Sequence, residues 1–278
     1  MPKGHLIRTP NIYTGNYRKL MKAAGKEDLE TMERLVKEEN MNLDYADPFH
    51  GVSLLNWCIF SGKINSFEKL LELGAAPNWQ DTPTLYTNPF PLPIIDAAKE
   101  GSTSRFLELL LKYGANPNPL SESELGYQNQ TPLLAAVSYH LWDNVKILAE
   151  NGADVNLTNG SMVTPLAEAF VNYDIEMAKY LIDHGADFNN LKFSAKTIAL
   201  DENTRQILNS YGSPINIGEL NILDFLRMLQ FSLDSEEYKI KMEVVRFLQI
   251  QGLDYWKYPI PEDVRNEHEG DPEYLLKY

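Results

Sequence analysis

The fold is decided by residues 131–156, TPLLAAVSYHLWDNVKILAENGADVN. Nearly the same pattern returns at residues 164–189, TPLAEAFVNYDIEMAKYLIDHGADFN. Each copy opens with Thr-Pro, continues with small and apolar residues, and closes with a Gly-Ala-Asp phrase. Thr131 and Thr164 lie 33 residues apart, and in both copies the closing glycine follows the threonine by 21 residues. A unit of constant size that recurs in this way indicates a repeat architecture.

The pattern within one unit predicts two helices. A threonine side chain can cap the free N–H groups at a helix start, and the first turn tolerates proline. Small residues such as Ala135 and Ala136 occupy the middle of the first helix, where they let the next unit approach closely. The second helix carries paired apolar residues such as Ile147 and Leu148, and Gly152 can adopt the left-handed conformation that ends it.

The closing phrase recurs at residues 74–78 (GAAPN), 114–118 (GANPN) and, more weakly, 212–216 (GSPIN). Together with the 33-residue period, the phrases TPLLAA, TPLAEA and NGADVN resemble ankyrin repeats. The resemblance covers roughly residues 17–216. It implies an all-α ankyrin-repeat solenoid of stacked antiparallel helix pairs with β-hairpin-like loops. The degenerate copies and uneven connectors are more similar to bacterial-type ankyrin-repeat proteins than to regular eukaryotic arrays.

We expect about six repeats, including degenerate caps, between an N-terminal arm at residues 1–16 and a C-terminal region. The C-terminal region comprises a helical cap or divergent repeat at 217–254 and an acidic tail at 255–278, packed through Trp256, Tyr258 and Tyr274. The predicted repeats are residues 17–47, 51–78, 92–118, 131–156, 164–189 and a degenerate 195–216.

The charge balance constrains the partner. The 278 residues include 25 Lys and Arg against 39 Asp and Glu, a formal net charge of −14, and they contain no run of clustered Lys and Arg. Nucleic-acid binding normally needs a basic stripe, so basic proteins or peptides fit better as partners. The sequence shows no secretory signal and no apolar stretch of membrane-spanning length. We therefore expect a cytoplasmic protein that binds neither nucleic acid nor membrane. The sequence leaves its oligomeric state open, and we favour a monomer.

A search for catalytic and metal-binding motifs favours a protein without enzymatic activity, cofactor or metal. The five histidines are scattered without ligand spacing, and the lone Cys58 falls at a small-residue core position. Two alternatives stay open. One is an enzyme with a site in the C-terminal region, where His268 lies among Glu267, Glu269 and Asp271. The other is a self-associating scaffold.

The resemblance also implies where a partner protein binds. In ankyrin solenoids the concave surface is lined by the loop before each opening position and by the residues seven and eight places after it. Two long connectors, residues 79–91 and 119–130, add further aromatic and acidic side chains, and aromatic residues are enriched in binding hot spots. The alternative is that Phe60 packs onto a helix of the neighbouring repeat and that Phe49 braces its own loop. The predicted partner-binding residues are Phe49, His50, Phe60, Trp79, Tyr86, Phe90, Lys99, Glu100, Glu122, Glu124, Tyr127, Gln128, Tyr139 and Asn172.

Two cellular roles suit such a binder. Acidic Glu122 and Glu124 would attract a basic partner. Neutralising a toxin inside the cell and acting as a secreted effector on host proteins are both compatible with this hypothesis.

Overall fold

A computed structural model describes residues 12–79, 92–119, 130–158, 163–189, 191 and 221–278. These residues form helices and no strand, so the expected all-α fold is confirmed for this part of the chain. The chain divides into two compact units, residues 1–153 (unit 1) and residues 154–278 (unit 2). The predicted repeat at 195–216 and most of the N-terminal arm lie outside the described residues.

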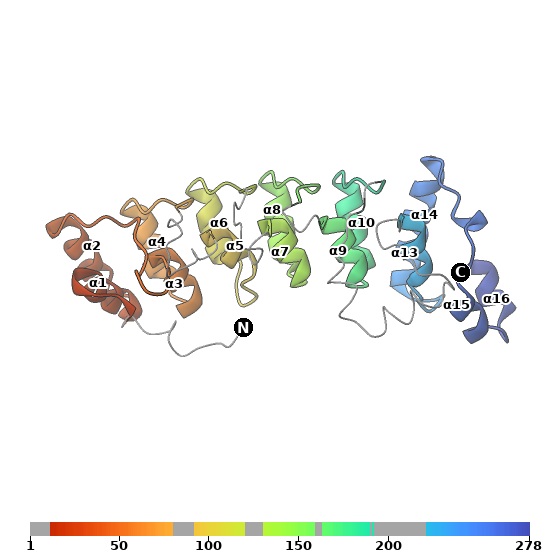
Figure 1. The fold of residues 1–278 in the computed structure, drawn as a ribbon, viewed down its shortest axis with the longest axis horizontal. Helices are drawn as coiled ribbons and strands as arrows, with labels where there is room; N and C mark the ends of the chain where they lie inside the picture. The colour runs from red at the N-terminus through yellow and green to blue at the C-terminus, as the bar shows by residue number, and fades with distance from the viewer. Residues whose placement is uncertain (1–11, 80–91, 120–129, 159–162, 190, 192–220) are drawn as a thin grey trace. The chain divides into compact units, whose positions relative to one another are not determined.

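The described residues of unit 1 form four helix pairs that follow one another along the chain (Figure 1). The first helices, α1, α3, α5 and α7, pack side by side in one row, and the second helices, α2, α4, α6 and α8, pack in another. The pairs are α1 (Gly15–Lys26) with α2 (Leu29–Glu38), α3 (Leu54–Ser61) with α4 (Ile64–Glu72), α5 (Pro93–Ala98) with α6 (Arg105–Lys112), and α7 (Pro132–Ser138) with α8 (Trp142–Glu150).

The helix starts and ends follow the predicted chemistry. The Thr131 hydroxyl accepts a hydrogen bond from the Leu134 N–H at 3.0 Å, and the Thr164 hydroxyl accepts one from the Ala167 N–H at 3.2 Å. At the other end of each of these two repeats, Gly152 has φ +85° and Gly185 has φ +91°. Both glycines therefore take the left-handed conformation that the sequence predicts.

The core lies between the two helix rows. Ala135 and Ala136 are fully buried, and Phe67 of α4 meets Phe106 of α6 edge to face with ring centroids 5.1 Å apart. Cys58 is also fully buried, and its burial raises the pKa of the thiol well above the ordinary value. The thiol thus serves as a small apolar group in the core, as expected.

The asparagine that ends each closing phrase bridges to the next repeat. The Asn78 amide donates to the Gly114 carbonyl at 3.0 Å, and the Asn118 amide donates to the Gly152 carbonyl at 2.8 Å. In unit 2, the Asn156 amide makes the same bond to the Gly185 carbonyl at 3.0 Å. Each asparagine therefore satisfies a carbonyl that the end of the next repeat's second helix leaves free.

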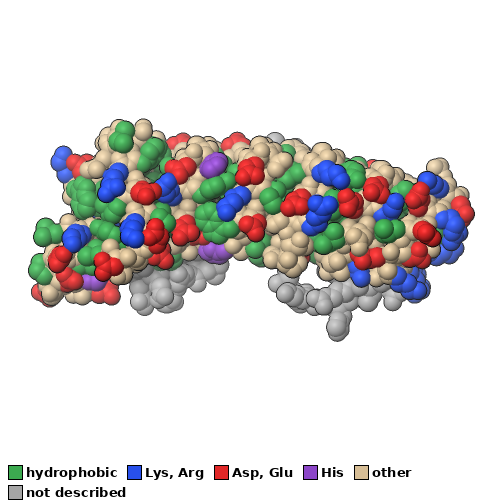
Figure 2. Space-filling view, turned by 180° about the vertical axis from the view of Figure 1, so that it is seen from behind, with side chains coloured by type: hydrophobic (Ala, Val, Ile, Leu, Met, Phe, Trp, Pro, Cys, Tyr) green, Lys and Arg blue, Asp and Glu red, His purple; other side chains and the backbone are tan. Residues whose placement is uncertain are grey.

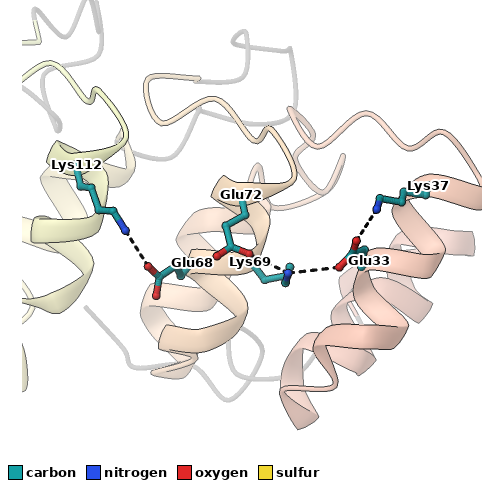
Figure 3. Close-up of polar contacts among 6 residues, drawn as sticks. All are labelled: Glu33, Lys37, Glu68, Lys69, Glu72 and Lys112. Carbon is teal, nitrogen blue, oxygen red and sulfur yellow. Dashed lines mark hydrogen bonds and ion pairs between the residues drawn. The ribbon is translucent and has the colours of Figure 1, made fainter.

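Ion pairs connect the second helices of unit 1 (Figure 3). Lys69 Nζ lies 2.8 Å from a Glu72 oxygen and 3.5 Å from a Glu33 oxygen on the neighbouring α2. Lys112 Nζ of α6 lies 3.3 Å from a Glu68 oxygen of α4. Acidic and basic side chains are also interspersed over the face that Figure 2 shows. Such exposed pairs each contribute about 0–1 kcal/mol.

Unit 2 begins with another helix pair and ends in smaller elements. The helix α10 contacts both α9 and α14, and Phe170 of α9 stacks on Phe225 of α13 with ring centroids 5.5 Å apart. The elements are α9 (Pro165–Val171), α10 (Ile175–Asp183), α13 (Ile222–Met228), α14 (Glu236–Ile250), the 3-10 helix η3 (Tyr255–Lys257), α15 (Glu262–Glu267) and α16 (Pro272–Lys277).

The C-terminal segment packs onto α13 and α14, mainly through tyrosines. Tyr274 is buried, and the Tyr258 hydroxyl donates to a carboxylate oxygen of Asp224 at 2.5 Å. Trp256, which we expected to pack, is 44% exposed, so that expectation is wrong. The adjacent Tyr255 is fully buried instead, and the Arg227 guanidinium stacks over its ring at 3.9 Å.

Candidate functional site

The predicted helix-end positions lie where each first helix stops. In unit 1, Phe60 and Ser61 form the last turn of α3, and Tyr139 is the residue that ends α7. In unit 2, Asn172 ends α9 in the same way. Each of these positions follows its opening residue by seven or eight places.

The residue that follows turns the chain toward the second helix in a left-handed conformation. Nine places after the opening position, Gly62 has φ +65°, His140 has φ +54° and Tyr173 has φ +58°. Only glycine adopts this conformation without steric cost. The two bulkier residues therefore occupy strained positions, with Tyr173 37% exposed.

Three of the four exposed aromatic side chains among the described residues lie at these same positions or in the loop before α3. The described part of the chain has six exposed large hydrophobic side chains. Of these, Phe49 (74% exposed) lies in the loop before α3, while Tyr139 (56%) and Tyr173 lie at first-helix ends. Phe60 and Trp79 are partly buried. Ordinary core packing thus accounts for neither Phe49 nor Tyr139.

The predicted residue His50 holds the loop before α3 together. The fully buried Asp47 carboxylate accepts hydrogen bonds from the His50 backbone N–H at 2.5 Å and from the His50 Nδ1 at 2.7 Å. The Asp47 N–H donates to the Val52 carbonyl at 3.0 Å, which closes the hairpin. The contacts of His50 are therefore those of a residue that shapes the loop next to Phe49.

A carboxyl with an unusual proton affinity lies beside the predicted Lys99. Burial raises the pKa of Asp96 on α5 to about 7, although nearby Lys99 and the Asn56 amide oppose the rise. The Asn56 Nδ2 donates to Asp96 at 2.7 Å, and burial lowers the pKa of Lys99. Asp96 is therefore partly protonated near neutral pH.

A hollow of about 840 Å³ opens at the ends of the first helices of unit 1. Two predicted residues, Phe60 and Glu100, line it together with Trp57 and Ser61. The Glu100 carboxylate accepts a hydrogen bond from the Ser102 N–H at 2.9 Å, which fixes it at the edge of the turn after α5. Among the described residues, no group of His, Cys, Asp and Glu side chains is arranged to hold a metal ion.

Comparisons with known proteins agree with the repeat pattern. A family model described as ankyrin repeats, in three copies, matches residues 94–192. The ankyrin repeat protein R598 of Acanthamoeba polyphaga mimivirus is 30% identical over 131 residues, which cover 45% of this chain and 38% of the relative. The chain contains ankyrin repeats.

Two other proteins with ankyrin repeats are also similar to this chain, one over a shorter segment and one at lower sequence identity. The ankyrin repeat-containing protein P1E11.10 of Schizosaccharomyces pombe is 41% identical over 87 residues, which cover 31% of this chain and 38% of the relative. The crystal structure of the ankyrin repeat protein EF0377 is 24% identical, with a TM-score of 0.48, and covers 61% of this chain and 82% of that one. The chain spans 38% of the length of each of the two curated relatives named here. The bacterial type stays a prediction.

Ankyrin repeats generally bind other proteins, and proteins of this family are typically not enzymes. The structure places eight of the fourteen predicted binding residues: Phe49, His50, Phe60, Trp79, Lys99, Glu100, Tyr139 and Asn172. The other six, Tyr86, Phe90, Glu122, Glu124, Tyr127 and Gln128, lie outside the described residues, and their role stays a prediction.

Sequence reasoning missed several residues that surround the ankyrin helix ends. Lys22 and Lys26 line the hollow from α1, and Lys63 lines it from the turn after α3. The basic N-terminal segment was a signal for the first two, because acidic residues are absent from residues 1–26. Tyr173 was also missed, although it follows the predicted Asn172 directly.

His268, the centre of the alternative enzymatic hypothesis, stacks on Tyr274 with ring centroids 3.7 Å apart. The imidazole therefore contributes to packing between α15 and α16. No described helix is long and apolar enough to cross a membrane.

Proposed function

We propose that this chain is a non-enzymatic module that binds another protein through the loops and first-helix ends of its ankyrin repeats. The observation that carries the proposal is the exposure of Phe49 and Tyr139, at 74% and 56%. Both belong to unit 1, and both occupy positions that in ankyrin solenoids face the partner. Exposed aromatic side chains supply a large contact area at a small cost in side-chain entropy.

The local structure supports a preformed surface. Phe49 lies in a hairpin that Asp47 and His50 close, and Tyr139 ends a helix that begins at the Thr131 cap. Because both backbones are fixed, a partner would order side chains only, and this preorganisation favours affinity. Intracellular neutralisation of a toxin and action as a secreted effector are two cellular uses of the same binding activity.

The test is capture of partners from a lysate of the source organism, followed by affinity measurement with the purified partner. The Phe49→Ala, Tyr139→Ala double variant should weaken binding by about 2 kcal/mol or more, which is roughly a 30-fold rise in Kd. The control is Ile250→Ala, because Ile250 is 82% exposed but ends α14 of unit 2 and belongs neither to a loop before a repeat nor to a first-helix end. Equal binding by the double variant and the wild type would refute the proposed surface.

A further inference from the structure

The hollow at the first-helix ends of unit 1 gathers three lysines that form no ion pair with any described residue. Lys22 and Lys26 lie one turn apart on α1, and Lys63 follows the left-handed Gly62 after α3. Lys22 and Lys26 are exposed, and Lys63 is partly buried. The three lysines therefore line a hollow that is open to an incoming ligand.

Three lysines on the second helices of unit 1 do form ion pairs. On the second helices, Lys37 pairs with Glu33 at 2.5 Å, and both Lys69 and Lys112 have glutamate partners (Figure 3). In the whole chain acidic residues outnumber basic ones by 39 to 25. Among the described residues that line the hollow, Glu100 is the acidic one. The hollow therefore has a local positive charge in a chain of net charge −14.

The walls of the hollow add apolar surface and unused polar groups. The indole of Trp57 is 1% exposed and lies against α1, where the ring would be 3.6 Å from a Cβ at Gly25. The Ser61 hydroxyl is buried and has no hydrogen-bond partner among the described residues. Partly buried Phe60 lines the hollow beside it. A volume of about 840 Å³ lies within the usual range for ligand sites.

We propose that this hollow binds an acidic peptide segment of a partner protein, with its Asp and Glu carboxylates on Lys22, Lys26 and Lys63 and an apolar residue against Phe60. Lysine presents a compact charge on a flexible stem, so it accommodates carboxylates without the fixed geometry of an arginine fork. The lysines come from two successive repeats, so a segment with several carboxylates engages all three. This inference rests on the proposed function, because it names the partner chemistry of the same helix ends.

The test measures binding of a fluorescein-labelled peptide, Glu-Glu-Leu-Glu-Asp-Glu, to the full chain by fluorescence anisotropy. The comparison peptide is Lys-Lys-Leu-Lys-Arg-Lys. The variant K22Q/K26Q/K63Q removes the three charges, and K37Q/K112Q/K146Q removes three exposed lysines from the second helices as a matched control. We expect the first variant to weaken binding about tenfold or more and the control to stay within about twofold. Raising the salt from about 50 to about 500 mM should weaken wild-type binding severalfold.

Three results would overturn the inference. The first is equal binding by the two triple variants, and the second is stronger binding of the basic peptide than of the acidic one. The third is displacement of the peptide by inorganic phosphate at matched concentration, which would make the hollow a site for small anions. If a captured partner loses affinity for the Phe49→Ala, Tyr139→Ala variant but not for K22Q/K26Q/K63Q, the proposed function holds and this inference alone fails.

Discussion

Replacing Asp96 by asparagine should make the protein more stable above neutral pH and leave it nearly unchanged in acid. Burial raises the pKa of the folded-state carboxyl from 3.8 to about 7. Between about pH 4 and pH 7 the folded chain therefore binds a proton that the unfolded chain does not, so wild-type stability falls as the pH rises. Asparagine keeps the acceptor oxygen for the Asn56 amide and removes the charge.

The size of the effect follows from the pKa difference. One pKa unit corresponds to about 1.4 kcal/mol, so ionised Asp96 destabilises the fold by up to roughly 4 kcal/mol above about pH 8. Loss of the attraction to Lys99 reduces the gain, and we expect about 1–4 kcal/mol in favour of D96N. At about pH 4 both side chains are neutral in the folded state, and the two proteins should agree within about 0.5 kcal/mol.

The assay is urea unfolding followed by circular dichroism in a series of buffers from about pH 4 to about pH 9. Glu150→Gln is the control for general charge effects, because Glu150 is exposed at the end of α8. The stability of D96N relative to wild type should rise along the series, and that of Glu150→Gln should not. A D96N protein that is equally destabilised at all pH values would refute the reasoning, since the carboxylate would then be a net stabilising group.

Substitutions at three further positions test the repeat architecture by urea unfolding. Leu166→Ala should cost about 2–5 kcal/mol because Leu166 is 1% exposed, and a loss below about 1 kcal/mol would contradict its place in the core. Asn118→Ala and Asn118→Asp should each lower the free energy of unfolding by about 1 kcal/mol, since both remove the amide donor to the Gly152 carbonyl. An Asp variant as stable as the wild type would show that this donor is dispensable. Tyr173→Gly should stabilise the fold by about 0.5–1 kcal/mol through relief of its left-handed backbone, and destabilisation would show that the ring packs more than its exposure suggests.

The local structure of a repeat could be predicted because its signals are local. Thr131, Pro132 and Gly152 act within one helix or its end, so their residue types alone specify a cap, a first turn and a left-handed stop. The hydrogen bond from Asn118 to the next repeat could not be predicted, because its partner Gly152 lies far from Asn118 in sequence. The same limit applied to Asn56 and Asp96, which are 40 residues apart in sequence.

The aromatic part of the candidate site was predictable from position within the repeat, and the lysine hollow was not. Tyr139 follows Thr131 by eight places, so the repeat frame alone assigns it to a helix end. Lys26 and Lys63 belong to different repeats, and only the packing of α1 against α3 brings them to one cavity. Nothing in the residues near Lys63 distinguishes it from a lysine on a solvated face.

Net charge is therefore a weak guide to the partner of this chain. At physiological salt the Debye length is about 8 Å, so a bound peptide responds to charges within one or two residues of it and little to the distant surface. The chain total of −14 predicts slow, salt-sensitive approach of an acidic protein from a distance. Within the hollow the balance is reversed, because Lys22, Lys26 and Lys63 face one Glu100 among its described lining residues. Both the negative net charge of the chain and the positive charge of the hollow would favour a partner with an acidic segment on a neutral or basic body. The acidic surface would attract a basic body, and the lysines would bind the acidic segment.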